Sequence, residues 1–110
     1  MKSIYRLKKK YQYNYVYKHS ETVSDKLLVL LYCKSNNPQT KVGFSVGKKY
    51  GHAVTRNTIR RKLKAAASTF MPRVKGGYNV IFVPRYSDKY DYWQILASMQ
   101  QLLTKAGLLQ

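Results

Sequence analysis

The sequence predicts a single α+β domain in which helices pack against a small β-sheet. The 110 residues are 45% hydrophobic, and a chain of this length forms one domain with one modest core. Apolar residues recur at helical spacing near both ends and in the middle of the chain, whereas three shorter segments have the continuous or alternating apolar pattern of strands. No repeat or break in composition marks a second domain, so residues 1–110 are expected to fold as one unit.

The first helix is expected at about residues 8–17. Tyr13, Val16 and Tyr17 follow the i, i+3, i+4 spacing of one apolar stripe. Tyr11 and Tyr15 lie partly off this stripe, so the helix is expected to bury only one side.

Three strands are expected at residues 27–33, 41–46 and 78–83. The first is a continuous apolar run that includes Cys33 as a small core residue and ends at a Ser-Asn-Asn-Pro breaker. The second alternates large apolar residues with small ones, as a strand packed on one face does. The third follows two glycines and stops at Pro84.

The middle helix is expected at residues 53–70, with two contrasting sides. With about 3.6 residues per turn, its core stripe consists of Ile59, Leu63, Ala66 and Phe70. Asn57, Arg61 and Lys64 fall on the far side, with Arg60 on the flank and Arg56 on the shoulder. Such a basic face, which has no carboxylate, suits the phosphates spaced along a nucleic-acid backbone.

The last helix is expected from Asp88 to near Gly107. Its apolar stripe consists of Tyr92, Ile95, Leu96, Met99, Leu102 and Leu103. Asp88 and Asp91 stand at its start, where acidic side chains cap a helix and complement its dipole.

The chain is strongly basic. It has 21 Lys and Arg residues against 4 Asp and Glu residues, which gives a formal charge of +17, and no acidic residue occurs between Lys26 and Ser87. Self-repulsion at this charge opposes the compact state, so a polyanionic partner is expected, and nucleic acid is the first candidate. A disordered basic tail is excluded because it would lack so many apolar residues.

Several other classes of protein are also excluded. The single Cys33 can form no internal disulfide, and no Cys/His cluster indicates structural zinc. The amino terminus has no uninterrupted apolar signal segment, and no stretch approaches the ~20 apolar residues of a membrane span. A soluble cytoplasmic protein without a membrane partner is therefore expected.

No active site is expected in the protein itself. A two-metal nuclease needs several converging carboxylates, whereas helix capping accounts for Asp88 and Asp91. His19 and His52 could form an acid–base pair for cutting RNA, but exposed or RNA-facing positions explain both more simply. Neither a catalytic residue nor a metal ligand is assigned.

The chain has eleven tyrosines. Tyr13, Tyr17 and Tyr32 could line a groove where unpaired bases stack, which stabilises binding by about 1–3 kcal/mol per base. Aromatic residues on apolar stripes equally occur in a core, although the tyrosine hydroxyl favours a cleft over the deep interior. Both interpretations stay open at this point.

Residues 44–63, FSVGKKYGHAVTRNTIRRKL, resemble the signature of the bacterial ribonuclease P protein component. In that family a Ser-Val-x-Lys-Lys strand end runs through a Gly-x-Ala-Val loop into a helix that carries a basic Arg-Asn-Arg motif. The matching positions are Ser45, Val46, Lys48, Lys49, Gly51, Ala53, Val54, Arg56, Asn57, Arg60 and Arg61. Thr58 departs from the second Arg of the motif. The amino-terminal RLKK segment, followed by Tyr13 and Tyr17, is also similar to the family pattern, where Phe is usual at both aromatic positions.

The resemblance implies the fold in more detail. It implies a two-layer α/β sandwich of about four strands and three helices, in the order α-β-β-β-α-β-α, like the second domain of ribosomal protein S5. It also implies a left-handed β-α-β crossover through the basic helix, where general rules alone predict a right-handed one.

The same resemblance implies a function as the accessory protein subunit of ribonuclease P. In that ribonucleoprotein a catalytic RNA, with Mg²⁺ bound mainly by the RNA, removes the 5′ leader of precursor tRNA by endonucleolytic hydrolysis. The residues implied to contact the catalytic RNA are Lys48, Lys49, Arg56, Asn57, Arg60, Arg61 and Lys64. A cleft between the first helix and the sheet, with Tyr13, Tyr17 and Tyr32, would hold the single-stranded leader. No obligate protein partner is implied.

Two alternatives accompany this expectation. A structural RNA-binding protein of the ribosomal type would have the same basic helix without a role in cleavage. A protein-only nuclease would have to use His19 and His52.

Overall fold

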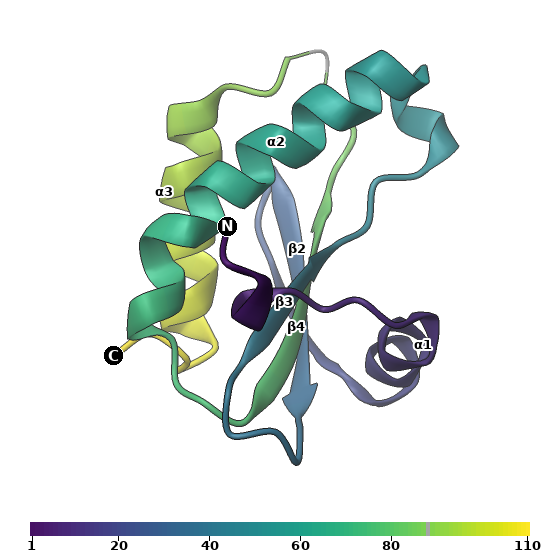
Figure 1. Cartoon of the computed structure of the whole chain (residues 1–110). Coiled ribbons are helices and arrows are strands. Elements are labelled where there is room, and N and C mark those ends of the chain that lie inside the picture. Colours follow the sequence, from purple (N-terminus) through teal and green to yellow (C-terminus); the bar gives the residue numbers. More distant parts are fainter. Residues whose placement is uncertain (88) are drawn as a thin grey trace.

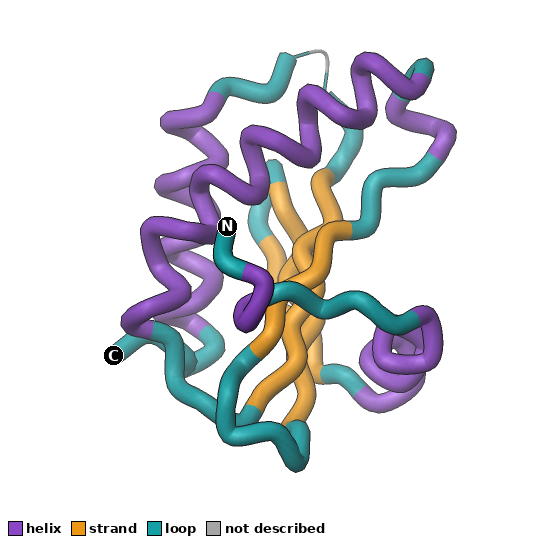
Figure 2. The backbone as a smooth tube through the Cα atoms, in the orientation of Figure 1, coloured by secondary structure: helices purple, strands orange, loops and turns teal. Residues whose placement is uncertain are grey.

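The computed structural model describes residues 1–87 and 89–110, which form one sheet flanked by α-helices (Figures 1 and 2). The helices are α1 (Lys10–His19), α2 (Ala53–Phe70) and α3 (Tyr92–Lys105). The strands are β1 (Glu21–Ser24), β2 (Leu28–Lys34), β3 (Lys41–Phe44) and β4 (Tyr78–Pro84). Short 3-10 turns occur at η1 (Ser3–Tyr5), η2 (Lys48–Tyr50) and η3 (Met71–Arg73). The expected α+β fold and its element order are confirmed.

The sheet has the strand order β1-β2-β4-β3. β2 pairs antiparallel with both β1 and β4, whereas β3 pairs parallel with β4, with Val42 opposite Val80. Parallel neighbours cannot be joined by a tight turn, so the chain crosses from β3 to β4 through α2. This connection places the basic helix beside the β3 edge of the sheet.

The helices cover both faces of the sheet. α2 and α3 pack on one face, and α1 packs on the other, as Figure 1 shows with α1 apart from the two longer helices. Alternate residues of β4 divide between the faces: Phe82 joins the cluster under α2 and α3, whereas Ile81 packs with Val16 of α1 and with Leu7. The sandwich of the sheet with α2 and α3 holds the larger core.

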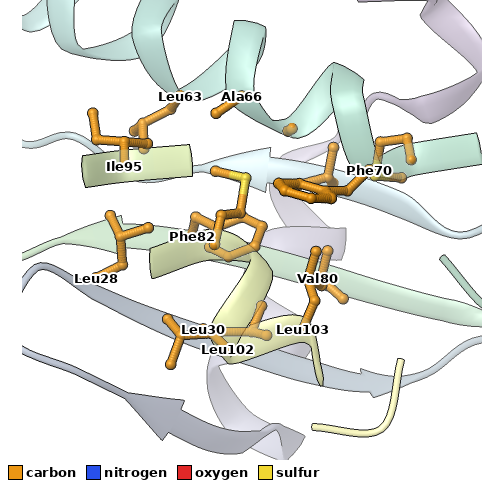
Figure 3. Close-up of a cluster of buried hydrophobic side chains, with 14 of the residues drawn as sticks. Leu28, Leu30, Leu63, Ala66, Phe70, Val80, Phe82, Ile95, Leu102 and Leu103 are labelled. Atoms are coloured by element: carbon orange, nitrogen blue, oxygen red, sulfur yellow. The ribbon is translucent and has the colours of Figure 1, made fainter. Parts of the chain in front are cut away.

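Figure 3 shows this larger core, in which Leu63 and Phe70 of α2 face the sheet. Leu63, Ile95 and Leu102 are fully buried, and Phe82 is buried between the helices and the sheet. The apolar stripe predicted for α2 is thus confirmed. Because this stripe fixes one side of α2, the opposite side is left free for contacts outside the domain.

The helix boundaries follow local hydrogen bonds. α2 begins and ends at the expected residues, but α1 begins at Lys10, because the side chain of Gln12 accepts from the Lys9 N–H at 3.1 Å. α3 begins at Tyr92, where Asp91 caps it by accepting from the Gln94 N–H at 3.1 Å. Asp88, the expected first residue of this helix, lies outside the described residues.

The fourth strand, β1, is the element that the apolar pattern does not predict. It is short, three of its four residues are polar, and it lies at the sheet edge with only β2 as a strand neighbour. The turn from β1 into β2 is built by Asp25, whose Oδ1 accepts from the N–H groups of Leu27 and Leu28 at 2.9 Å. Asp25 Oδ2 also accepts from Ser98 Oγ of α3, so one carboxylate joins the hairpin to the helix layer.

Candidate nucleic-acid interface

The side of α2 that faces away from the core carries the basic residues predicted to contact RNA. Asn57 and Arg61 are exposed, and Arg56, Arg60 and Lys64 are half-buried. A shallow hollow on this side is lined by Val54, Asn57, Arg60, Arg61 and Lys64. Three of these five side chains are cationic and none is acidic, so the hollow offers a site for the phosphates of a nucleic-acid backbone.

Arg60 is held in place by two hydrogen bonds. One guanidinium nitrogen donates to Asn57 Oδ1 at 3.2 Å, and the other donates to the carbonyl oxygen of Val46 at 3.1 Å. The first contact joins residues one turn apart on α2, and the second ties α2 to the segment after β3. The N–H donors of the Arg60 guanidinium therefore have a fixed direction before any ligand binds.

Thr58 stands where the resemblance leads us to expect Arg, and its hydroxyl has a local role. Thr58 Oγ1 donates to the carbonyl oxygen of Val54 at 3.0 Å and lies 3.5 Å from a guanidinium nitrogen of Arg61. The substitution therefore removes one cation from the basic face but places an acceptor beside another cation.

The loop before α2 presents Lys48 and Lys49 to solvent. It is anchored by Tyr50, which is buried and whose hydroxyl donates to the carbonyl oxygen of Pro84. Gly51 has a φ of 122°, a conformation that residues other than Gly rarely adopt, and this lets the chain turn sharply into α2. The two lysines thus occupy a fixed loop at the amino-terminal end of the basic helix.

A second hollow lies at the β3 edge of the sheet, between α1 and α2. Its volume is about 190 Å³, and it is lined by Arg6, Leu7, Tyr13, Val42, Phe44, Arg60 and Lys64. The amino-terminal segment closes one side, because the Leu7 N–H donates to the Val42 carbonyl oxygen at 3.0 Å. Strand, helices and amino-terminal segment thus all contribute to this cleft.

Tyr13 lines the cleft from α1, and Tyr17, which is not among the lining residues, lies next to Tyr13 on the same helix. Their ring centroids are 6.4 Å apart with an interplanar angle of 47°. Tyr17 is 48% exposed, whereas Tyr13 is half-buried, and burial raises the pKa of the Tyr13 phenol. The Tyr13 hydroxyl therefore stays protonated near neutral pH and lies 3.4 Å from the Leu7 carbonyl oxygen that it faces. The Tyr17 ring is therefore accessible to a ligand, whereas the Tyr13 ring is partly enclosed by its neighbours.

Arg60 and Lys64 line both hollows. The basic side of α2 and the aromatic cleft are therefore one continuous surface, with these two cations at the boundary. A polyanion bound along α2 would therefore pass close to Tyr13, which lines the cleft together with these two cations. This continuity is the central geometric feature of the candidate interface.

Tyr32 does not belong to this cleft, and its predicted place there is wrong. Tyr32 packs against the larger core, on the sheet face opposite α1, whereas its neighbour Leu31 packs with Val16 and Tyr13 of α1. Side chains alternate between the two faces of a strand, so a difference of one residue moves a side chain across the sheet. Leu31 is thus the residue of β2 on the α1 face next to Tyr13.

Four cleft residues, Arg6, Leu7, Val42 and Phe44, were missing from the predicted set. Arg6, Leu7 and Phe44 lie in segments that carry the resemblance, whereas Val42 does not. Arg6 reaches the cleft because the amino-terminal segment runs beside β3, with an isolated bridge to Val42. That pairing joins segments 36 residues apart and leaves no trace in local periodicity.

The two histidines are not brought together. His19 ends α1 and packs against Tyr15, with ring centroids 4.4 Å apart, whereas His52 precedes α2 in the exposed loop. Cys33 is half-buried against the α1 face, and burial raises the pKa of its thiol. Among residues 1–87 and 89–110, no group of three or more His, Cys, Asp or Glu side chains could hold a metal ion.

The Ribonuclease P family model matches residues 1–107 of this chain. The chain belongs to the ribonuclease P protein family. The ribonuclease P protein component of Natranaerobius thermophilus is 35% identical over 111 residues, which cover 100% of this chain and 96% of that protein. The corresponding protein of Clostridium botulinum is 36% identical over 106 residues, with 94% and 95% covered.

Solved structures of ribonuclease P proteins have the same fold. The protein from Staphylococcus aureus matches with a TM-score of 0.85 at 27% identity, over 96% of this chain and 98% of that one. A mutant of the S. aureus protein that is described as defective in mRNA degradation activity also matches with a TM-score of 0.85. The Thermotoga maritima protein matches with a TM-score of 0.81 at 20% identity, over 91% and 96%, which supports the fold alone. In the described part of this chain, no helix is long and apolar enough to cross a membrane.

Proposed function

We propose that this chain is the protein subunit of ribonuclease P and assists a catalytic RNA in removing the 5′ leader from precursor tRNA. Family membership supports the general role in tRNA processing. The observation that carries the detailed proposal is the continuity of the basic and aromatic surfaces through Arg60 and Lys64. One protein surface can then contact a folded RNA and an adjacent single strand at the same time.

The basic side of α2 and its preceding loop bind the catalytic RNA. The contact residues are Lys48, Lys49, Arg56, Asn57, Arg60, Arg61 and Lys64. Binding of cations to phosphates releases counterions, so each contact contributes affinity that weakens as the salt concentration rises. Arg60 contributes more than its charge, because its hydrogen bonds to Asn57 and Val46 fix the direction of its donors.

The Tyr13–Tyr17 cleft binds the single-stranded leader. Unpaired bases stack on aromatic rings whatever their identity, which suits leaders of different sequence. Mature tRNA lacks the leader, so this cleft favours the precursor over the product. Precursor binding and product release then both benefit from one contact.

Hydrolysis itself belongs to the RNA and its bound Mg²⁺. Among the described residues, no group of three or more metal-ligating side chains forms. The side chains of the protein bind, orient and neutralise phosphates around the active site of the RNA. This proposal places the protein in the cytoplasm, with tRNA and the catalytic RNA.

The decisive experiment measures cleavage of a 5′-extended precursor tRNA at low millimolar Mg²⁺. Its three arms are the purified protein, a bacterial ribonuclease P RNA, and both together. Cleavage only, or far faster, with both establishes the accessory role. Equal cleavage with and without the protein favours the structural RNA-binding alternative, and cleavage by the protein alone, lost in His52→Ala, favours the protein-only nuclease.

Variants then separate the two surfaces. Arg60→Ala and Arg61→Ala are expected to weaken assembly with the catalytic RNA and to lower its salt dependence, whereas Tyr17→Ala weakens precursor binding. Tyr86→Ala is the matched control, because Tyr86 is also exposed but lies in the segment after β4. If Tyr17→Ala lowered the affinity for mature and precursor tRNA equally, the assignment of the leader to this cleft would be wrong.

A further inference from the structure

A larger hollow lies on the other flank of α1, away from Tyr13 and Tyr17. Its volume is about 770 Å³, and it is bounded by α1, the carboxyl end of β2 with the turn that follows, and the start of β4. Val16 is the buried residue of α1, and helical geometry places Tyr13 and Tyr17 on one side of it and Tyr15 and His19 on the other. The two hollows are therefore separated by the body of the helix.

The helix wall of this hollow carries a pair of adjacent aromatic rings that are tilted relative to each other. Tyr15 and His19, one turn apart, have ring centroids 4.4 Å apart with an interplanar angle of 38°. Tyr15 is 53% exposed, so the ring pair is not sealed by other side chains. An exposed aromatic platform of this kind is what unpaired nucleobases stack on.

The sheet wall of the hollow offers a polar group that lacks a partner. Asn79 of β4 lies on the α1 face, because its neighbour Val80 joins the larger core on the opposite face. Asn79 Oδ1 is buried and accepts no hydrogen bond, which is unfavourable for a carbonyl oxygen. Because Asn79 lines the hollow, a rotation of its amide that exposes Oδ1 would let a ring N–H or amino group of a base donate to it.

The charges around the hollow favour an anionic ligand. Lys18 and Lys34 line it from α1 and β2, and no acidic side chain is among the lining residues that the structure describes. Aromatic platform, amide and cations correspond to the three parts of a nucleotide: the flat face of the base, its polar edge and its phosphate.

We propose that this hollow binds one unpaired nucleotide of an RNA strand. The base stacks on the Tyr15–His19 pair, its edge donates to Asn79, and its phosphate contacts Lys18 and Lys34. The site is distinct from the Tyr13–Tyr17 cleft. This inference rests on the proposed function only for the source of the RNA strand. That source is either the catalytic RNA or a distal part of the leader.

The first test is a nuclear magnetic resonance titration of the full chain with an unstructured ten-nucleotide RNA. The side-chain amide of Asn79 and the ring of His19 are expected to shift. Tyr15→Ala is expected to weaken binding on the order of tenfold, whereas Tyr15→Phe keeps the ring and most of the affinity. Asn79→Asp, which has the same shape but adds a negative charge, is expected to weaken binding without loss of the fold.

Tyr86→Ala is the control for a general loss of aromatic surface, because Tyr86 is 71% exposed and does not line this hollow. The proposal is overturned if Tyr86→Ala weakens binding as much as Tyr15→Ala does. It is also overturned if only Tyr17→Ala weakens binding, because the short strand then occupies the other cleft alone.

Two further arms identify the source of the nucleotide. If Tyr15→Ala weakens binding of the protein to the catalytic RNA, that RNA supplies the nucleotide. If it weakens only the binding of precursors with long leaders to the assembled complex, the leader supplies it. Binding of the short RNA at Tyr15 without stimulation of precursor cleavage would leave this site standing while the proposed ribonuclease P role falls.

Discussion

The ring of Tyr13 lies directly against the backbone of Gly43. A Cβ atom at residue 43 would lie 2.5 Å from Tyr13 Oη, so the half-buried position of this ring depends on the absence of a side chain there. The glycine of β3 thus shapes the cleft from the strand side, and the tyrosine of α1 fills the space that the glycine leaves.

Gly43→Ala is expected to push the Tyr13 ring outward and to weaken precursor binding on the order of tenfold. The expected cost in the free energy of unfolding is about 1–3 kcal/mol, because the Tyr13 ring has to move to make room for the added methyl group. Leader-dependent affinity and urea unfolding measure the two effects. Gly47→Ala is the control, because Gly47 has a φ of −85° and a Cβ atom there would meet nothing within 4 Å. Unchanged affinity in Gly43→Ala would show that the position of Tyr13 does not matter for the leader.

Thr58→Arg is expected to raise the affinity for the catalytic RNA several-fold. The change restores a cation to the basic side of α2, and one added phosphate contact steepens the salt dependence of binding by about one unit of slope. Titrations at a series of salt concentrations measure this slope. Thr104→Arg on the exposed side of α3 adds the same charge away from α2. An equal gain in affinity in this variant would show that net charge alone causes the effect.

Asp25→Asn is expected to lower the free energy of unfolding by about 1–2 kcal/mol at pH 7. Burial alone would raise the pKa of the Asp25 carboxyl, but hydrogen bonds from Ser98, Leu28 and Leu27 hold it below the usual value of 3.8. A lowered pKa means that the stabilisation is present above pH 3.8 and is lost only as the pH falls below it. Urea unfolding at several pH values should show the gap between the two proteins closing only in strong acid.

Asp91→Asn is the matched control for this prediction, because Asn caps a helix as well as Asp does. It is expected to change the stability little at any pH. A loss in Asp25→Asn that persisted undiminished in strong acid would contradict the role given to the ionised carboxylate.

Thr40→Val is expected to destabilise the fold by about 1–3 kcal/mol with almost no change in side-chain shape. Thr40 is fully buried, its hydroxyl donates to the Lys75 carbonyl oxygen, and it accepts from the Tyr78 N–H at 3.1 Å. Both backbone groups lose their partner in the variant. Thermal or urea unfolding measures the loss, and Thr104→Val at an exposed position should have little effect.

The parts of the fold that the sequence predicts well are those with strong local periodicity. The apolar stripe from Ile59 to Phe70 fixes both the extent of α2 and the direction of its basic side. By contrast, β1 is short and has one strand neighbour, so no apolar pattern distinguishes it from a loop. Its position depends on the Asp25 turn and on the contact with Ser98, which is 73 residues away.

The candidate site was predicted in part for similar reasons. The residues of α2 follow from one helix and one motif, and their placement is regular. Tyr32 lies in a continuous apolar run, where no alternation reveals which side chains face α1, so only the structure separates it from Leu31. Arg6 and Phe44 join the cleft through pairing between distant segments, which local patterns do not encode.

The amino-terminal segment that pairs with Val42 has a consequence for how copies of this protein behave toward one another. A bare sheet edge is a template on which another strand can add, and edge-to-edge association leads to aggregates. Here the segment at Arg6 and Leu7 covers the outer edge at β3, and the other edge, β1, is only four residues long. The protein therefore carries its own protection against edge-to-edge association, and displacement of this segment would uncover a strand beside the proposed RNA-binding surface.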